Sequence, residues 1–156
     1  MYSKKQAIPM RQTAKINKSI EIPSDIGYIK KVSHELLERL KEKGIDRSIQ
    51  FDVRLAVEEA VRNAIEHGNN YNKELPVLIR YSVGAKKITV DIQDKGTGFH
   101  LKSVPDPREG DNILEAGGRG VFLMHKLMDK IRYNKKGNRV TMIKFFGDSG
   151  AVIRRS

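Results

Sequence analysis

The feature that most constrains the fold is a change in the spacing of apolar residues part-way along the chain. From 29 to 40 and from 53 to 65, apolar residues recur every three or four positions, the period of an amphipathic helix. From 77 to 83 and from 87 to 93 they alternate with polar residues, the period of a strand with one buried face. Because a turn around Gly84 joins these two runs, the sequence predicts two helices followed by an antiparallel hairpin.

The other segments complete an α+β pattern. Alternating isoleucines predict a first strand near 15–22, and Gly44 and Gly68 mark the ends of the two helices, the second spanning about 49–67. A third helix is expected at about 119–130 and a final hairpin at 131–135 and 139–146. The expected fold is a two-layer sandwich in which helices cover one face of a mostly antiparallel mixed sheet. We expect residues 15–146 to form this domain, with a basic lead-in over 1–14 and a tail over 147–156.

The composition excludes several functional classes. The 156 residues include no cysteine, which excludes disulfides, thiol catalysis and cysteine-bound zinc. The net charge of +11 suits nucleic acid, an acidic protein or phosphate groups as partners, but aromatic residues make up only 6%, which argues against direct nucleic-acid binding. No signal peptide and no apolar run long enough for a membrane span are visible, so we expect a cytoplasmic protein without membrane attachment.

Three short polar segments stand out against this framework. Glu59 and Asn63 lie one turn apart on the second helix and project from one face. Asp94 directly follows a strand and opens the sequence Asp-Lys-Gly-Thr-Gly, whose glycines would let a flat ligand approach the backbone. The glycine-rich segment 117–120 starts the third helix after a long loop over 94–117, and free N–H groups at a helix N-terminus suit a phosphate. Each segment alone also fits an ordinary solvated helix face or turn.

Together, the three segments resemble the three boxes of the ATPase superfamily that contains gyrases, chaperones, histidine kinases and mismatch-repair proteins. They are most similar to those of the small bacterial anti-sigma-factor serine kinases, which consist of this domain alone, and the resemblance covers about residues 15–146. It implies a histidine-kinase-like ATPase domain with an ATP lid in the long loop, and ATP and Mg²⁺ as cofactors. It also implies phosphorylation of a serine on an anti-anti-sigma protein, sequestration of a sigma factor, and homodimerisation.

The resemblance implies a role for each motif residue. Glu59 matches the base that activates the attacking hydroxyl or water, and Asn63 matches the residue that holds Mg²⁺. Asp94 matches the carboxylate that accepts a hydrogen bond from the adenine amino group, and Thr141 matches a threonine that supports Asp94. The remaining residues expected to bind ATP, by making room for adenine or by contacting phosphates, are Gly96, Gly98, Gly117, Gly118, Arg119 and Gly120.

Two departures leave alternatives open. Arg62 lies between Glu59 and Asn63 and could pair with the glutamate at 58, 59 or 66, and a tight pair with Glu59 would make that carboxylate a poorer base. The segment 131–139 is unusually basic for a domain whose relatives bind a sigma factor. The alternative function is a nucleotide-binding regulatory switch that sequesters a partner without phosphoryl transfer. A detached histidine-kinase catalytic domain ranks last, since the loop is short and no phospho-accepting helix precedes the domain.

Overall fold

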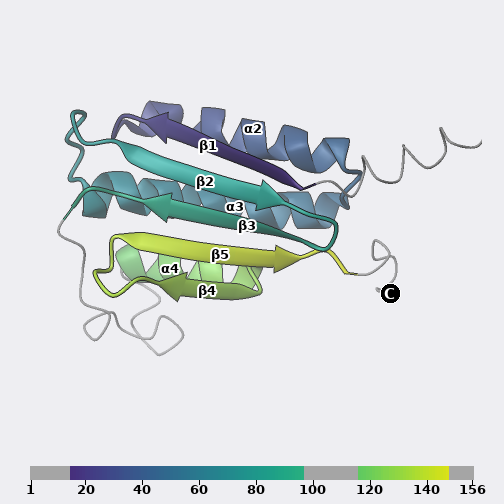
Figure 1. Ribbon diagram of the computed structural model, residues 1–156. Coiled ribbons are helices and arrows are strands. Elements are labelled where there is room, and N and C mark those ends of the chain that lie inside the picture. The colour runs from purple at the N-terminus through teal and green to yellow at the C-terminus, as the bar shows by residue number, and fades with distance from the viewer. Residues whose placement is uncertain (1–14, 97–115, 148–156) are drawn as a thin grey trace, which may run out of the picture.

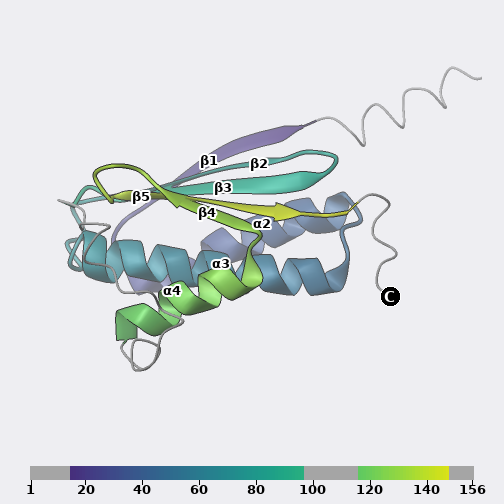
Figure 2. The same cartoon turned by 90° about the horizontal axis from the view of Figure 1, so that it is seen from below.

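The computed structural model describes residues 15–96 and 116–147, which form one sheet and a layer of helices packed against it (Figures 1 and 2). The strands are β1 (Ile16–Ile22), β2 (Val77–Val83), β3 (Lys87–Gln93), β4 (Lys130–Tyr133) and β5 (Arg139–Phe145). The helices are the 3₁₀ helix η1 (Ile26–Tyr28), α2 (Ile29–Glu42), α3 (Arg47–Asn63), the π-helix η2 (Ala64–Gly68) and α4 (Ala116–Leu127). The predicted α+β sandwich with helices on one face of the sheet is confirmed.

The sheet has five strands in the order β1-β2-β3-β5-β4. Every pairing between the described strands is antiparallel, so the sheet is not mixed as the sequence had suggested. The connection from β1 to β2 explains the difference. It contains a pair of helices, α2 and α3, that pack on each other and return the chain to the end of the sheet that it left (Figure 2). The next strand therefore runs back along β1 instead of beside it in the same direction.

The core fills the space between the two layers. On the sheet side it contains the alternating apolar residues of β2 and β3, such as Val83 and Val90. On the helix side it contains the stripes of α2 and α3, including Leu36, Val53 and Val61. All five side chains are at most 1% exposed. The spacing that predicted each element is thus the spacing that buries its apolar face, a burial worth about 25 cal/mol for each Å² removed from water.

The ends of the helices have local causes. Gly44 ends α2 as predicted: it has a φ of 72°, and its N–H donates to the Lys41 carbonyl at 2.9 Å. Asp25 caps η1, because its Oδ1 accepts the Gly27 N–H at 2.9 Å. The second predicted helix spans Arg47–Asn63 as an α-helix and continues as η2 to Gly68, and α4 begins at Ala116 and not at 119.

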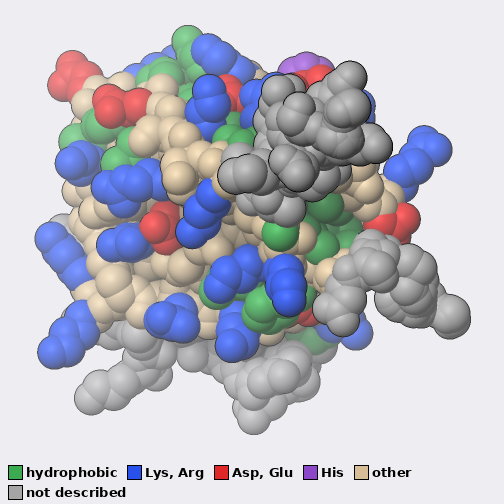
Figure 3. All heavy atoms as spheres, turned by 45° about the vertical axis from the view of Figure 1, so that its right-hand side comes forward, with side chains coloured by type: hydrophobic (Ala, Val, Ile, Leu, Met, Phe, Trp, Pro, Cys, Tyr) green, Lys and Arg blue, Asp and Glu red, His purple; other side chains and the backbone are tan. Residues whose placement is uncertain are grey.

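The sheet face away from the helices is polar and largely basic. The strand register places Ser19, Arg80, Asp91, Thr141 and Arg132 in one row across all five strands. None of the described helices covers this face (Figure 2), and the view in Figure 3 shows many Lys and Arg side chains with few Asp or Glu side chains between them.

Within the described ranges, no helix has both the length and the apolar character needed to cross a membrane. The ATP lid predicted for the long loop falls mainly on residues 97–115, which lie outside the described residues.

Candidate functional site

Glu59 and Asn63 lie on the face of α3 that packs against α4. A Cβ built on Gly120 of α4 would lie 2.6 Å from Glu59 Oε1 and 3.5 Å from Asn63 Nδ2. The amide of Asn63 also contacts the Met124 sulfur at 3.9 Å. Gly120 therefore allows α4 to approach α3 at the point where both polar side chains project. These three residues, which the sequence assigned to two separate motifs, are brought together.

Glu58, the neighbouring acid, points toward α2 instead. Its Oε2 accepts a hydrogen bond from Ser33 Oγ at 2.7 Å, and its Oε1 lies 3.7 Å from Arg54 Nη1. The side chain is only 15% exposed. Glu58 therefore links α2 to α3, and both of its carboxylate oxygens already have partners. It lies on a different face of α3 from Glu59.

Arg62 pairs with Glu59, which is one of the three glutamates that the sequence left open. Its Nε lies 3.7 Å from Glu59 Oε2, beyond hydrogen-bond distance, and the two side chains are 38% and 27% exposed. An ion pair of this length between side chains in contact with water contributes little to stability. Glu59 is therefore available to accept a proton.

Asp94 directly follows β3 and is buried, with 7% of its surface exposed. Burial raises the pKa of its carboxyl above the usual value, and a hydrogen bond from the Gly96 N–H partly opposes this shift in pKa. That bond, to Oδ1, is 2.8 Å long. Asp94 is thus a carboxylate kept out of water at the end of a strand, which is typical of a residue that binds a ligand.

Two glycines pack directly against Asp94 and against each other. A Cβ on Gly68 would lie 2.2 Å from Asp94 Oδ2, and a Cβ on Gly96 would lie 1.9 Å from the Gly68 carbonyl oxygen. Position 96 therefore has no space for a side chain, because the backbone of η2 lies against it. The sequence motif around Gly96 gave no sign of this contact. Gly68 follows Asn63 by about one turn of helix, so Asp94 and Asn63 lie at the same end of the sandwich.

The backbone of Asp94 is held by Asn138, which the sequence analysis missed. The Asp94 N–H donates to the Asn138 carbonyl at 2.9 Å, and Asn138 Nδ2 approaches the Asp94 carbonyl oxygen at 3.4 Å. Thr141, the residue expected to support Asp94, is not brought to it. Because side chains alternate along β5, Thr141 lies on the helix-free face, where its Oγ1 donates to Asp91.

The remaining predicted residues are described only in part. Gly98 lies outside the described residues. Gly117, Gly118 and Arg119 belong to the first turn of α4.

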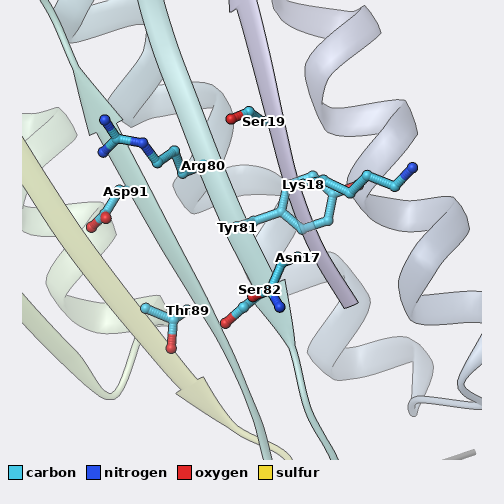
Figure 4. A pocket seen from close by; sticks show the side chains of 8 residues that line it. All are labelled: Asn17, Lys18, Ser19, Arg80, Tyr81, Ser82, Thr89 and Asp91. Carbon is cyan, nitrogen blue, oxygen red and sulfur yellow. The ribbon is translucent and has the colours of Figure 1, made fainter. Parts of the chain in front are cut away.

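A hollow of about 410 Å³ lies over β1, β2 and β3 (Figure 4). Its lining includes Ser19, Arg80, Thr89 and Asp91, whose side chains belong to the helix-free face. Since Glu59 and Asn63 lie on the helix layer, this hollow is separate from the candidate site.

A family model described as the histidine kinase-like ATPase domain matches residues 22–144, most of the chain. The chain belongs to this family. It is 28% identical over 153 residues to the serine-protein kinase RsbW of Staphylococcus aureus strain MSSA476, with 93% of this chain and 90% of that protein covered. RsbW of strain JH9 is similar to the same extent.

Solved structures support the same fold. The crystal structure of the RsbU and RsbW domains of a Mycobacterium tuberculosis protein superposes with a TM-score of 0.57 at 20% sequence identity. The match covers 83% of this chain and 32% of that chain, so the chain corresponds to about a third of the larger protein.

Among the residues that the structure describes, the candidate site offers few ligands for a metal ion. Among the described residues, no three His, Cys, Asp or Glu side chains lie together in a way that could hold a metal ion. Asn63 supplies a hard amide oxygen, and Mg²⁺ commonly combines one or two protein oxygen ligands with phosphate oxygens and water. The residues present therefore fit a Mg²⁺ ion that is bound together with a nucleotide.

Proposed function

We propose that this chain is an ATP- and Mg²⁺-dependent serine kinase that phosphorylates an anti-anti-sigma protein and sequesters a sigma factor, acting in the cytoplasm as a homodimer. The observation that carries the proposal is the contact of Gly68 with Asp94 at the end of the sandwich where Gly120 packs on Glu59 and Asn63. Similarity to the serine-protein kinase RsbW over nearly the whole chain supports the reaction type.

In the proposed complex, Asp94 selects the adenine base. Its Oδ1 already accepts the Gly96 N–H, and a carboxylate can accept further hydrogen bonds. The 6-amino group of adenine is a donor, whereas the corresponding oxygen of guanine is an acceptor. A buried carboxylate here therefore favours ATP over GTP, with the backbone of Gly98 completing the space for the base.

The start of α4 binds the phosphates in this proposal. Gly117 and Gly118 fall in its first turn, where the backbone N–H groups have no partner within the helix and the helix dipole is positive, and Arg119 and Gly120 follow directly. Mg²⁺ held by Asn63 supplies positive charge beside the phosphate oxygens when it is bound.

Glu59 acts as the general base. The serine hydroxyl oxygen of the partner forms a bond to the γ-phosphorus as the bond from that phosphorus to ADP breaks, and the hydroxyl proton passes to the Glu59 carboxylate. Phosphoryl transfer of this kind depends mainly on positioning and charge stabilisation, so one base and the phosphate-binding helix start are sufficient protein groups.

The Arg62–Glu59 ion pair favours a second candidate function. The Arg62 guanidinium lies 3.7 Å from Glu59 Oε2, so this carboxylate has a partner other than the serine hydroxyl of a substrate. A domain whose Glu59 stays with Arg62 would bind nucleotide as a regulatory switch and sequester its partner without transferring phosphate.

Incubation of the purified protein with γ-labelled ATP, Mg²⁺ and a candidate anti-anti-sigma protein separates these functions. Labelled serine on the partner supports the kinase. Bound ATP without label on any partner supports the switch, and labelled histidine would contradict both. The Arg62→Gln variant should transfer phosphate at least as fast as the wild type if the ion pair restrains Glu59.

A further inference from the structure

Asn69 is a buried polar residue that joins distant parts of the chain next to Asp94. It directly follows η2 and is 2% exposed. Its Oδ1 accepts the Lys95 N–H at 2.8 Å. At the other end of the amide, Nδ2 donates to three acceptors. These are Ser24 Oγ at 2.8 Å and the carbonyl oxygens of Leu75 and Pro76, both at 3.1 Å.

The backbone after Asn69 is held in an unfavourable conformation. Asn70 and Tyr71 have φ values of 53° and 62°, in the left-handed region. Asparagine tolerates this region, but a bulky tyrosine rarely adopts it. The Tyr71 N–H donates to the Ile65 carbonyl at 2.9 Å, which closes the turn. Such a conformation persists only where the surroundings determine it, and here it accompanies the inward placement of the Asn69 amide.

Asn69 and Asn138 hold the two peptide groups on either side of Asp94. Asn138 accepts the N–H of Asp94 itself, and Asn69 accepts the N–H of the next residue, Lys95. With both peptides fixed, the Cα–Cβ direction of Asp94 is fixed as well. The bond from the Gly96 N–H then sets the plane of the carboxylate.

We propose that Asn69 is a positioning residue for adenine recognition, which holds the Asp94 carboxylate in its binding orientation before nucleotide arrives. The inference rests on the proposed function, since it assigns Asp94 to the adenine base. A carboxylate that is already in place binds the adenine amino group without the entropy cost of ordering the segment that carries Asp94. Asn69 therefore increases the affinity for adenine without touching the base.

The test compares Asn69→Ala with the matched variant Ser24→Ala. Ser24 is 1% exposed, donates to the Leu75 carbonyl at 2.6 Å and accepts from Asn69, but none of its hydrogen bonds reaches Asp94, Lys95 or Gly96. Both variants should unfold at lower denaturant concentration. Only Asn69→Ala should lower the affinity for Mg-ATP, by about tenfold, and reduce the preference for ATP over GTP by a similar factor.

Equal ATP preference in Asn69→Ala and wild type, or the same loss in Ser24→Ala, would overturn the positioning role. Wild-type protein that binds ATP and GTP equally would instead overturn the proposed function, so the two failures are distinguishable. Amide hydrogen exchange of nucleotide-free wild type decides the matter if Asn69→Ala does not fold. The Lys95 amide should exchange at least about a hundredfold more slowly than in an unstructured peptide, and exchange at the unprotected rate refutes the proposal.

Discussion

The backbone of Gly68 occupies the space that a side chain on Gly96 would need. A Cβ on Gly96 would lie 1.9 Å from the Gly68 carbonyl oxygen and 2.7 Å from its carbonyl carbon. The end of η2 and the segment that carries Asp94 are therefore in direct backbone contact. The two halves of the proposed site, one on α3 and one after β3, cannot move apart without breaking this contact.

Gly96→Ala should consequently destabilise the fold by about 3 kcal/mol, since the added methyl group meets backbone and not a flexible side chain. Gly84→Ala is the matched control: its nearest neighbour would be the Lys87 carbonyl oxygen at 3.8 Å, so we expect a change within about 0.5 kcal/mol. Urea unfolding of both variants measures the difference. Equal free energies of unfolding would contradict the close contact.

Asp94→Asn should weaken ATP binding by about 1.5–3 kcal/mol, the usual range for a charge-assisted hydrogen bond. The discrimination between ATP and GTP should be lost with it, because an amide can donate to guanine as well as accept from adenine. Calorimetric titration with each nucleotide tests both effects. Unchanged affinity and selectivity would mean that adenine binds elsewhere.

The same substitution should stabilise the fold near pH 7. Burial raises the pKa of Asp94, so between the unfolded and folded pKa values the folded protein retains a proton that the unfolded chain has lost. The free energy of unfolding of the wild type therefore falls as pH rises through this window. An asparagine side chain at position 94 cannot ionise, so Asp94→Asn avoids this fall and is more stable than the wild type. The difference between the two proteins should vanish below the unfolded pKa of Asp94.

Asp91→Asn provides the comparison for this stability effect. Asp91 lies on the same strand but is paired with Arg139 at 2.9 Å and with Thr141. Its replacement should give no gain at pH 7. Denaturant unfolding at several pH values follows both variants, and a destabilised Asp94→Asn protein at pH 7 would be inconsistent with this account.

Glu59→Gln should bind ATP almost normally but transfer phosphate roughly 100- to 10,000-fold more slowly, the usual effect of removing a general base. Glu58→Gln should alter transfer far less, because Glu58 bonds to Ser33 on α2. Single-turnover transfer and equilibrium binding, measured side by side, separate the two steps. Transfer by Glu59→Gln at near the wild-type rate would assign catalysis to positioning alone.

Asn63→Ala should abolish Mg²⁺-dependent ATP binding while leaving the fold intact, because Asn63 is only partly buried and its amide makes one long contact with the Met124 sulfur at 3.9 Å. Titration of Mg²⁺ at fixed ATP, together with a thermal melt, tests the prediction. A variant of normal stability that binds Mg-ATP with wild-type affinity would remove the metal role.

Elements with a clear apolar period could be predicted from the sequence. The strands at 77–83 and 87–93 match β2 and β3 because alternation places one apolar face on the helices. The same reasoning applied to β5 places Val140 and Met142 in the core and Thr141 on the other face. The parity of the strand was therefore the signal that Thr141 does not support Asp94.

Asn69 and Asn138 could not be predicted in the same way. Both look like ordinary turn residues, and their roles depend on partners far along the chain. Asn69 meets Ser24 across 45 positions, and Asn138 meets Asp94 across 44. Only the assembled fold shows which turn asparagines are buried, because hydrophobic periodicity reports the core and not the polar contacts that close its end.

The pairing of β1 with β2 determines the order in which the domain can assemble. Ile16 pairs with Val83 and Ile22 with Val77, so the loop closed by this pairing contains α2 and α3, whereas the β2–β3 hairpin is local. Distant pairing carries the larger entropy cost, so we expect β1 to dock after the hairpin. Ser24 follows β1 and reaches Asn69 only then. In a newly synthesised chain, the hydrogen bond that ties the start of the domain to the end of the sandwich that carries Asp94 would therefore be among the last to form.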